Sequence, residues 1–243
     1  TTTLVPSQAA TVTENESEDK EKSKFNPAYS YLVLAIILIV RVATQWQQKS
    51  LGYFYGYKGL GDQAGNAIFE IATAYPELNQ YYGALVGLAY SVPYSLLGLV
   101  AGAATSYFNR KYMMAGFIAL MSLTQVANGA FNSFGILCGM RFMHGAMSSF
   151  INPLCFSLLA DYFPPDRRGT ANSILSSANY LAISLSSMTI LLISNYGWRA
   201  AYTVMGGFGL VGALLGALFM KNPIRGRFDK KTEEEKIKED SIK

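Results

Sequence analysis

Two arginines lie inside long apolar stretches of this sequence, each on a helical face with polar neighbours. Arg41 shares a face with Gln45 and Gln48, because residues three and four apart on a helix lie above one another. A cation in hydrocarbon costs ~3 kcal/mol or more without a polar partner, and a guanidinium in a dry cleft suits a carboxylate or phosphate. We therefore predict one substrate-binding site formed by Arg41, Gln45, Gln48, Arg141, His144 and Asn152.

Each of the two faces also has a simpler interpretation. The first helix could leave the membrane at Gln45, so that the two amides meet water instead of a ligand. Arg141 could extend to the interface from a packing stripe of small residues, Gly145 and Ser148 among them. Arg41 lies near the middle of its apolar stretch and is therefore the stronger candidate for ligand contact.

The apolar residues come in blocks, and 51% of the 243 residues are hydrophobic, which is typical of a polytopic membrane protein. A helix needs roughly 20 apolar residues to cross a bilayer. Six blocks reach or approach that length, so we predict an all-α bundle of six transmembrane helices. The predicted spans are Tyr29–Gln48, Tyr82–Tyr107, Tyr112–Phe131, Phe134–Phe163, Ala171–Ile193 and Ala200–Met220. A short amphipathic helix is expected near Ile68–Tyr75.

Small and hydroxyl-bearing residues follow two of these spans. Gly83, Gly87, Gly98 and Gly102 recur in the second span at spacings that let helices approach closely, and Pro93 is expected to kink it. A serine ladder from Ser173 to Ser187 follows the fifth span. It could serve close packing or line a polar path.

Two loop motifs give a resemblance to a known family. The stretch from Gly102 to Lys111 resembles the signature G-x-x-x-D-R-x-G-R-R between helices 2 and 3 of the major facilitator superfamily. The stretch from Ala160 to Ala171, ADYFPPDRRGTA, resembles the loop after helix 4, and both look most like the spinster-type sugar and lipid transporters. The resemblance implies a gating loop made of Gly102, Asn109, Arg110, Lys111, Asp161, Arg167, Arg168 and Gly169.

The same resemblance implies half of a transporter. Two six-helix bundles would enclose a midplane site and rock about it, with helices 1 and 4 lining the cavity and helices 2 and 5 facing the second half. Ser106 and Tyr107 replace the acidic residue and the arginine of the signature, which removes charges that latch the family's gate. Apart from Asp161, at the loop edge of the fourth span, no Asp or Glu lies inside a predicted span, so proton coupling would use the second half or His144.

The distribution of charge predicts the chain's organisation. We expect a disordered cytoplasmic tail over 1–27, the six-helix bundle over 28–223 and a charged cytoplasmic linker or tail over 224–243. Lysines and arginines gather on the side of both termini, so the positive-inside rule places that side in the cytoplasm or its equivalent. The net charge of +4 is scattered over loops, which does not favour nucleic-acid binding.

Secondary transport of a small organic solute by alternating access is the predicted function, and the buried arginines favour an anion. The alternative is a half bundle that serves as a structural subunit of a larger membrane assembly. An enzyme is not expected, because the chain has one histidine, no clustered metal ligands and no nucleophile with a base. No cofactor or metal is expected. The expected partners are lipids and a second six-helix half, supplied by the same chain continued, a homodimer or a separate subunit.

Overall fold

The computed structural model describes residues 26–223 and residue 228, and this part of the chain contains helices and no strand. The predictions for 1–25 and for nearly all of 224–243 therefore lie outside the described residues. The helices are α2 (Pro27–Gly56), α3 (Ile71–Ala74), α4 (Glu77–Val86), α5 (Leu88–Tyr107), α6 (Arg110–Ala130), α7 (Phe134–Tyr162) and α8 (Pro165–Phe219), with a 3-10 turn at Gly61–Gln63.

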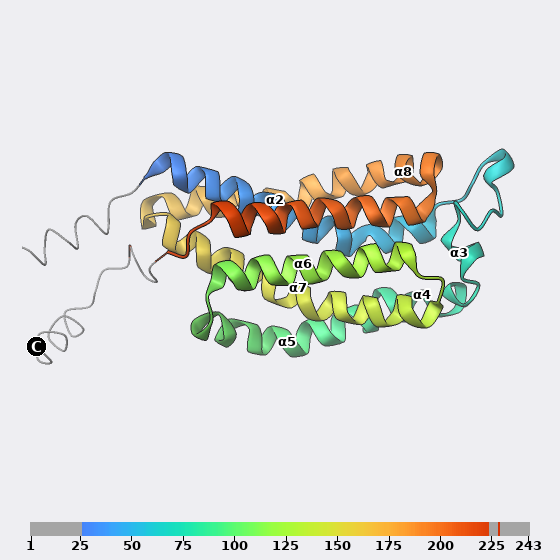
Figure 1. Cartoon of the computed structure of the whole chain (residues 1–243), viewed down its shortest axis with the longest axis horizontal. Coiled ribbons are helices and arrows are strands. Elements are labelled where there is room, and N and C mark those ends of the chain that lie inside the picture. Colours follow the sequence, from blue (N-terminus) through green and yellow to red (C-terminus); the bar gives the residue numbers. More distant parts are fainter. Residues whose placement is uncertain (1–25, 224–227, 229–243) are drawn as a thin grey trace, which may run out of the picture.

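Six long helical segments lie side by side in the described residues, which confirms the predicted bundle (Figure 1). Four stretches are long and apolar enough to cross a membrane: Pro27–Gly56, Glu77–Thr105, Arg110–Ala130 and Pro165–Phe219. The last runs for 55 residues and contains two segments, because its backbone turns back at Gly197. The 29-residue helix α7 completes the six.

The turn at Gly197 depends on glycine. Its φ is +83°, in the left-handed region that side chains disfavour, and a Cβ there would overlap the carbonyl oxygen of Ile68. That carbonyl accepts from the N–H of Trp198 at 3.2 Å, and the indole N–H of Trp198 donates to Ala67 at 2.8 Å. The turn between the last two segments is therefore fixed against the connection that precedes α4.

The second span differs from its prediction. It begins at Glu77, and its irregular backbone lies at Gly87, with φ and ψ both −86°, which separates α4 from α5. Pro93 lies inside α5 as one helix residue. Gly83, Gly98 and Gly102 would meet nothing within 4 Å if they carried a Cβ, so they make no close approach within this chain. The close approach on this helix instead comes from α7, where a Cβ on Gly145 would overlap the Tyr90 carbonyl oxygen.

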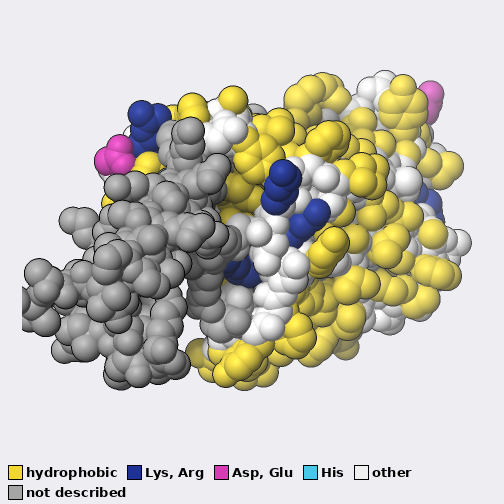
Figure 2. Space-filling model, turned by 60° about the vertical axis from the view of Figure 1, so that its left-hand side comes forward, with side chains coloured by type: hydrophobic (Ala, Val, Ile, Leu, Met, Phe, Trp, Pro, Cys, Tyr) yellow, Lys and Arg dark blue, Asp and Glu magenta, His cyan; other side chains and the backbone are white. Residues whose placement is uncertain are grey.

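The two ends of the bundle differ in their polar groups. The described chain enters and leaves at one end, where asparagine N-caps begin α2 and α6: Asn26 accepts from Tyr29 N–H and Asn109 from Lys111 N–H, both at 3.2 Å. Lysine and arginine side chains lie among polar groups at this end, and hydrophobic side chains cover the flank (Figure 2). The connection 57–76 and the Gly197 turn lie at the other end (Figure 1).

Glu70 organises the connection 57–76. Its carboxylate accepts from Gly59 N–H at 2.8 Å and from the Thr73 hydroxyl at 3.0 Å. Hydrogen bonds from the Gly59 and Gly65 backbones hold the pKa of Glu70 below its ordinary value. A lowered folded-state pKa stabilises this connection above the unfolded-state value of about 4.3, and the stabilisation is lost as pH falls through the folded-state value.

We therefore expect amide hydrogen exchange in residues 57–76 to accelerate, relative to the intrinsic rate, when the pH falls from 6 to 3. Glu70→Gln should remove most of this dependence on pH, because the amide does not titrate. Glu77→Gln, which changes a neighbouring exposed carboxylate, is the matched control. A Glu70→Gln protein with an unchanged pH profile would contradict the role given to this carboxylate.

Candidate functional site

A polar cavity of about 340 Å³ lies between α2, α5 and α7. It is lined by Arg41, Thr44, Gln45, Gln48, Tyr90, Ser91, Tyr94, Ser95, Ser148 and Asn152. Its volume lies within the range of about 300–1,000 Å³ that is common for small-molecule sites. The structure thus brings four of the six predicted site residues, from α2 and α7, around one cavity.

Arg41 is the cation of this cavity. Its side chain is 9% exposed, and neither Nε nor Nη1 has a hydrogen-bond partner among the described residues. An unpaired guanidinium in a low-dielectric bundle is unfavourable by several kcal/mol unless an anion or water meets it. The free donors therefore make Arg41 the strongest anion-binding group in the cavity.

Hydroxyl and amide groups form the wall opposite Arg41's helix. Tyr90 and Ser148 share a hydrogen bond of 2.7 Å between their hydroxyls, and the Asn152 amide donates to the Tyr94 hydroxyl at 2.9 Å. The rings of Tyr90 and Tyr94 stack at 5.7 Å. Asn152 Oδ1 has no partner and is left as a free acceptor. The cavity thus offers one cation together with neutral donors and acceptors.

Arg141 lies beside the cavity and is not part of its lining. Its Nη2 donates to the Gln48 carbonyl at 3.0 Å, and its guanidinium carbon lies 5.0 Å from the centre of the Tyr90 ring. With a side chain 6% exposed, it does not reach the interface as the packing interpretation required. Arg141 instead links α7 to one cavity residue on α2 and one on α5.

His144 also lies outside the cavity lining, at 1% exposure. Its Nδ1 lies 3.1 Å from the Gln125 amide nitrogen and 3.4 Å from the Thr124 hydroxyl, both on α6. No described acid faces this imidazole, and Arg141 lies one turn away on the same helix. A second buried positive charge is unfavourable there. The contacts of His144 are those of a polar core group, and its predicted role in proton coupling gains no support from this geometry.

Part of the lining was missed from the sequence. The missed residues are Thr44, Tyr90, Ser91, Tyr94, Ser95 and Ser148. The four on the second span lie at i, i+1, i+4 and i+5, which is one helical face, and that spacing could have identified them.

The predicted gating-loop residues lie at the end of the bundle where the described chain begins and ends. Arg110 forms a buried ion pair with Asp161, and its Nη1 donates to the Ser157 hydroxyl at 2.8 Å. Arg168 Nε donates to the Phe163 carbonyl at 3.0 Å. Lys111 lies over the Tyr112 ring, Arg167 lies 3.8 Å from Asp166, and Gly102 and Gly169 have open space where a Cβ would be. Arg110 and Asp161 thus join α6 to α7, although Ser106 and Tyr107 replace the acidic residue and the arginine of the signature.

Apolar helices thus surround a polar cavity that contains a buried arginine, and a cation inside a membrane bundle indicates a functional site. The sequence model of the Major Facilitator Superfamily matches residues 59–241, and the chain belongs to this family. Among the described residues no group of three or more His, Cys, Asp or Glu side chains could hold a metal ion.

Several sequence relatives have names that describe probable transporters. The probable galactarate/D-glucarate transporter GarP of Escherichia coli K12 is 36% identical over 85 residues, which cover 35% of this chain and 19% of the relative. Protein spinster homolog 1 of Homo sapiens is 26% identical over 172 residues, 67% of this chain and 33% of the relative. The probable sulfoacetate transporter SauU of Cupriavidus necator is 27% identical over 139 residues, 57% of this chain and 32% of the relative. These relatives lend no support to the structural-subunit alternative.

The fold resembles a solved spinster homologue. A crystal structure of a bacterial homologue of the human lysosomal transporter Spinster, in an inward-facing and occupied conformation, superposes with a TM-score of 0.66 at 19% identity. The match covers 86% of this chain and 48% of the other. The predicted spinster-like resemblance is therefore confirmed, and this chain spans about half of that structure.

Proposed function

We propose that this chain forms one half of a secondary transporter for a small organic anion, which binds at Arg41. The observation that carries the proposal is the buried guanidinium of Arg41, which lines a polar cavity and whose Nε and Nη1 have no hydrogen-bond partner among the described residues. A carboxylate meets those donors with charge-assisted hydrogen bonds. The names of two relatives, the probable galactarate/D-glucarate transporter GarP and the probable sulfoacetate transporter SauU, agree with an anionic substrate.

The neutral lining favours a hydroxylated anion. Stacked Tyr90 and Tyr94, with Ser91, Ser95 and Asn152, present hydroxyls and an amide beside the single cation. Hydroxyls on a substrate could exchange hydrogen bonds with these groups, whereas a hydrocarbon tail would leave them unpaired at a cost of about 1–3 kcal/mol each. A sugar acid therefore fits the cavity better than a fatty acid.

Transport requires a second bundle that closes the cavity. The hydroxyls of Ser173, Ser177, Ser184 and Ser187 are exposed along the first segment of α8 and bond to their own helix. This small, polar face and the open glycines of α5 suit a neighbouring helix more than lipid. We propose that a second six-helix half docks there and that alternating access follows from rocking of the two halves. By the positive-inside rule, the end where the described chain begins and ends is cytoplasmic or its equivalent.

Ligand-induced thermal stabilisation of the reconstituted chain tests the proposal. D-glucarate and galactarate should raise the melting temperature in a saturable manner, whereas galactitol, which has the hydroxyls without a carboxylate, should not. Binding to one half requires no transport, so the test is independent of the second bundle. Equal shifts in melting temperature for galactitol and D-glucarate would contradict the proposal that the site selects an anion.

Asn152 is expected to hydrogen-bond the hydroxyls of the substrate rather than its charged group. Asn152→Ala is expected to weaken D-glucarate binding about fivefold, because one hydrogen bond contributes about 1 kcal/mol. Adipate, the six-carbon diacid without hydroxyls, should bind wild type and variant within about twofold of each other. The measurement is the dissociation constant of each ligand by isothermal titration. An equal loss for both ligands would mean that the substitution disturbs the cavity as a whole.

A further inference from the structure

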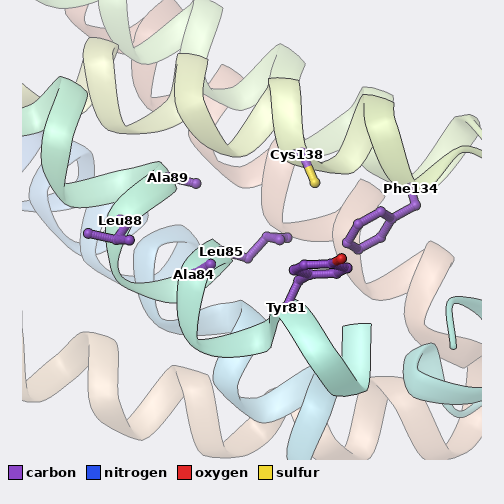
Figure 3. Close-up of a pocket in the computed structure, with 7 residues that line it drawn as sticks. All are labelled: Tyr81, Ala84, Leu85, Leu88, Ala89, Phe134 and Cys138. Atoms are coloured by element: carbon purple, nitrogen blue, oxygen red, sulfur yellow. The ribbon is translucent and has the colours of Figure 1, made fainter. Parts of the chain in front are cut away.

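A second cavity, of about 380 Å³, lies between α4, α5 and α7 and differs in chemistry from the first (Figure 3). It is lined by Tyr81, Ala84, Leu85, Leu88, Ala89, Phe134 and Cys138. Its walls are hydrocarbon, aromatic rings and one thiol. It contains no charged group that could hold the proposed anion, so its ligand must be of another class.

The break at Gly87 shapes this groove. Tyr81, Ala84 and Leu85 come from α4 and Leu88 and Ala89 from α5, so the lining crosses the point where the two helices separate. In Figure 3 the rings of Tyr81 and Phe134 lie at one end and the Cys138 thiol projects toward α4. Those two ring centres are 6.2 Å apart. The groove is thus a formed recess closed at one end by aromatic rings.

The groove faces away from the anion cavity. Tyr90 and Tyr94 line the anion cavity from one face of α5, whereas Leu88 belongs to another face and is 68% exposed. In a membrane protein such a surface meets hydrocarbon, and an unfilled recess in it would lose the dispersion contacts of its walls.

The length of the groove and the charged residue beside it point to one occupant. From Tyr81 to Ala89 the helices rise about 12 Å at ~1.5 Å per residue, close to the ~15 Å of one leaflet's hydrocarbon. Glu77, exposed one turn before Tyr81 on the same face of α4, lies beyond the aromatic end. Glu77 is the one charged residue of α4, so the charge at the start of this helix is negative.

We propose that the groove binds one acyl chain of a phospholipid whose headgroup carries an ammonium group, placed beside the Glu77 carboxylate. The chain lies against Leu85, Ala89 and Cys138 and fills the recess left by the helix break. The ammonium pairs with Glu77 at the interface, which sets a preference for phosphatidylethanolamine over phosphatidylglycerol. The site is a lipid site on the flank of the bundle, separate from the substrate cavity.

Native mass spectrometry of the full chain, released from bilayers of equal phosphatidylethanolamine and phosphatidylglycerol, tests this proposal. We expect one retained phosphatidylethanolamine per chain. Ala89→Trp and the milder Ala84→Leu, which fill the groove, should reduce this retention at least fivefold. Leu99→Trp places the same indole side chain on α5 outside the groove and should leave retention unchanged. Wild-type retention in both groove-filling variants would overturn the proposal.

The headgroup is tested separately. Glu77→Gln should keep a retained lipid but reduce the preference for phosphatidylethanolamine at least threefold. A preference for phosphatidylglycerol in the wild type would overturn the assignment of the headgroup. A lipid-free dimer that dissociates when Ala89 is replaced by Trp would overturn the proposal that a lipid occupies the groove. The groove would then bind a second copy of the chain.

Discussion

Replacing Arg41 by glutamine is expected to weaken binding of D-glucarate about 100-fold or more. Arg41 is the only cation that lines the described cavity, and its Nε and Nη1 are free to donate. Truncating one partner of a buried, hydrogen-bonded charge pair costs about 2–5 kcal/mol, and ~1.4 kcal/mol is a tenfold change. The dissociation constant of the reconstituted chain is the measurement.

Two further variants separate charge from shape. Arg41→Lys keeps the charge but loses the planar fork, so we expect an intermediate loss of roughly tenfold. Lys49→Gln removes a cation from the same helix that bonds to Asn179 at 2.6 Å outside the cavity, and it should leave affinity unchanged. The melting temperature without ligand should stay the same or rise in Arg41→Gln, because an uncompensated buried charge is removed. If Lys49→Gln weakened binding as much as Arg41→Gln, the loss of affinity would come from the change in net charge and not from a contact with Arg41.

The second large effect is expected at the ion pair between α6 and α7. Arg110 and Asp161 are 5% and 4% exposed, and Arg110 also donates to the Ser157 hydroxyl. Removing one partner of a buried pair destabilises by about 3–5 kcal/mol. For a protein of this size we expect Arg110→Ala to lower the melting temperature by roughly 10 °C.

The matched control is the neighbouring cation. Lys111 contacts the ring of Tyr112, so Lys111→Ala should change the melting temperature by less than about 2 °C. Replacing both charges, with Arg110→Met and Asp161→Leu, should recover most of the loss, because no buried charge is then left alone. If Arg110→Ala melts like the wild type, the pair does not join the two helices in the way described.

Both predictions rest on residues that could be selected from the sequence. A charge inside an apolar block stands out because hydrocarbon excludes it, and this identified Arg41. The loop motifs around Arg110 and Asp161 likewise carried the family resemblance. Periodicity placed Gln45 and Gln48 on Arg41's face, since the helical repeat is a local property of the chain. The six segments followed from the length that a bilayer demands.

The tertiary structure decided which faces meet. Arg141 and His144 have the same kind of sequence signal as Arg41, yet Arg141 contacts the Gln48 carbonyl and His144 contacts Gln125 on α6. Those partners lie 93 and 19 residues away in the chain, so no local repeat could indicate them. The rotation of each helix about its axis depends on packing against its neighbours, which a hydropathy pattern does not contain.

The same reason explains why the close helix contact of the second span was predicted at the wrong residues. Its spacing of small residues predicted close packing at Gly98 and Gly102, but the close approach occurs where Gly145 of α7 meets Tyr90. That contact turns Tyr90 and Tyr94 toward Arg41 and leaves the glycines on the outer face. The sequence by itself determined the helices, their family and the buried cation, because these depend on composition and local period. Only the packing of six helices decided which polar groups share a cavity with Arg41, because that depends on contacts between residues distant in the chain.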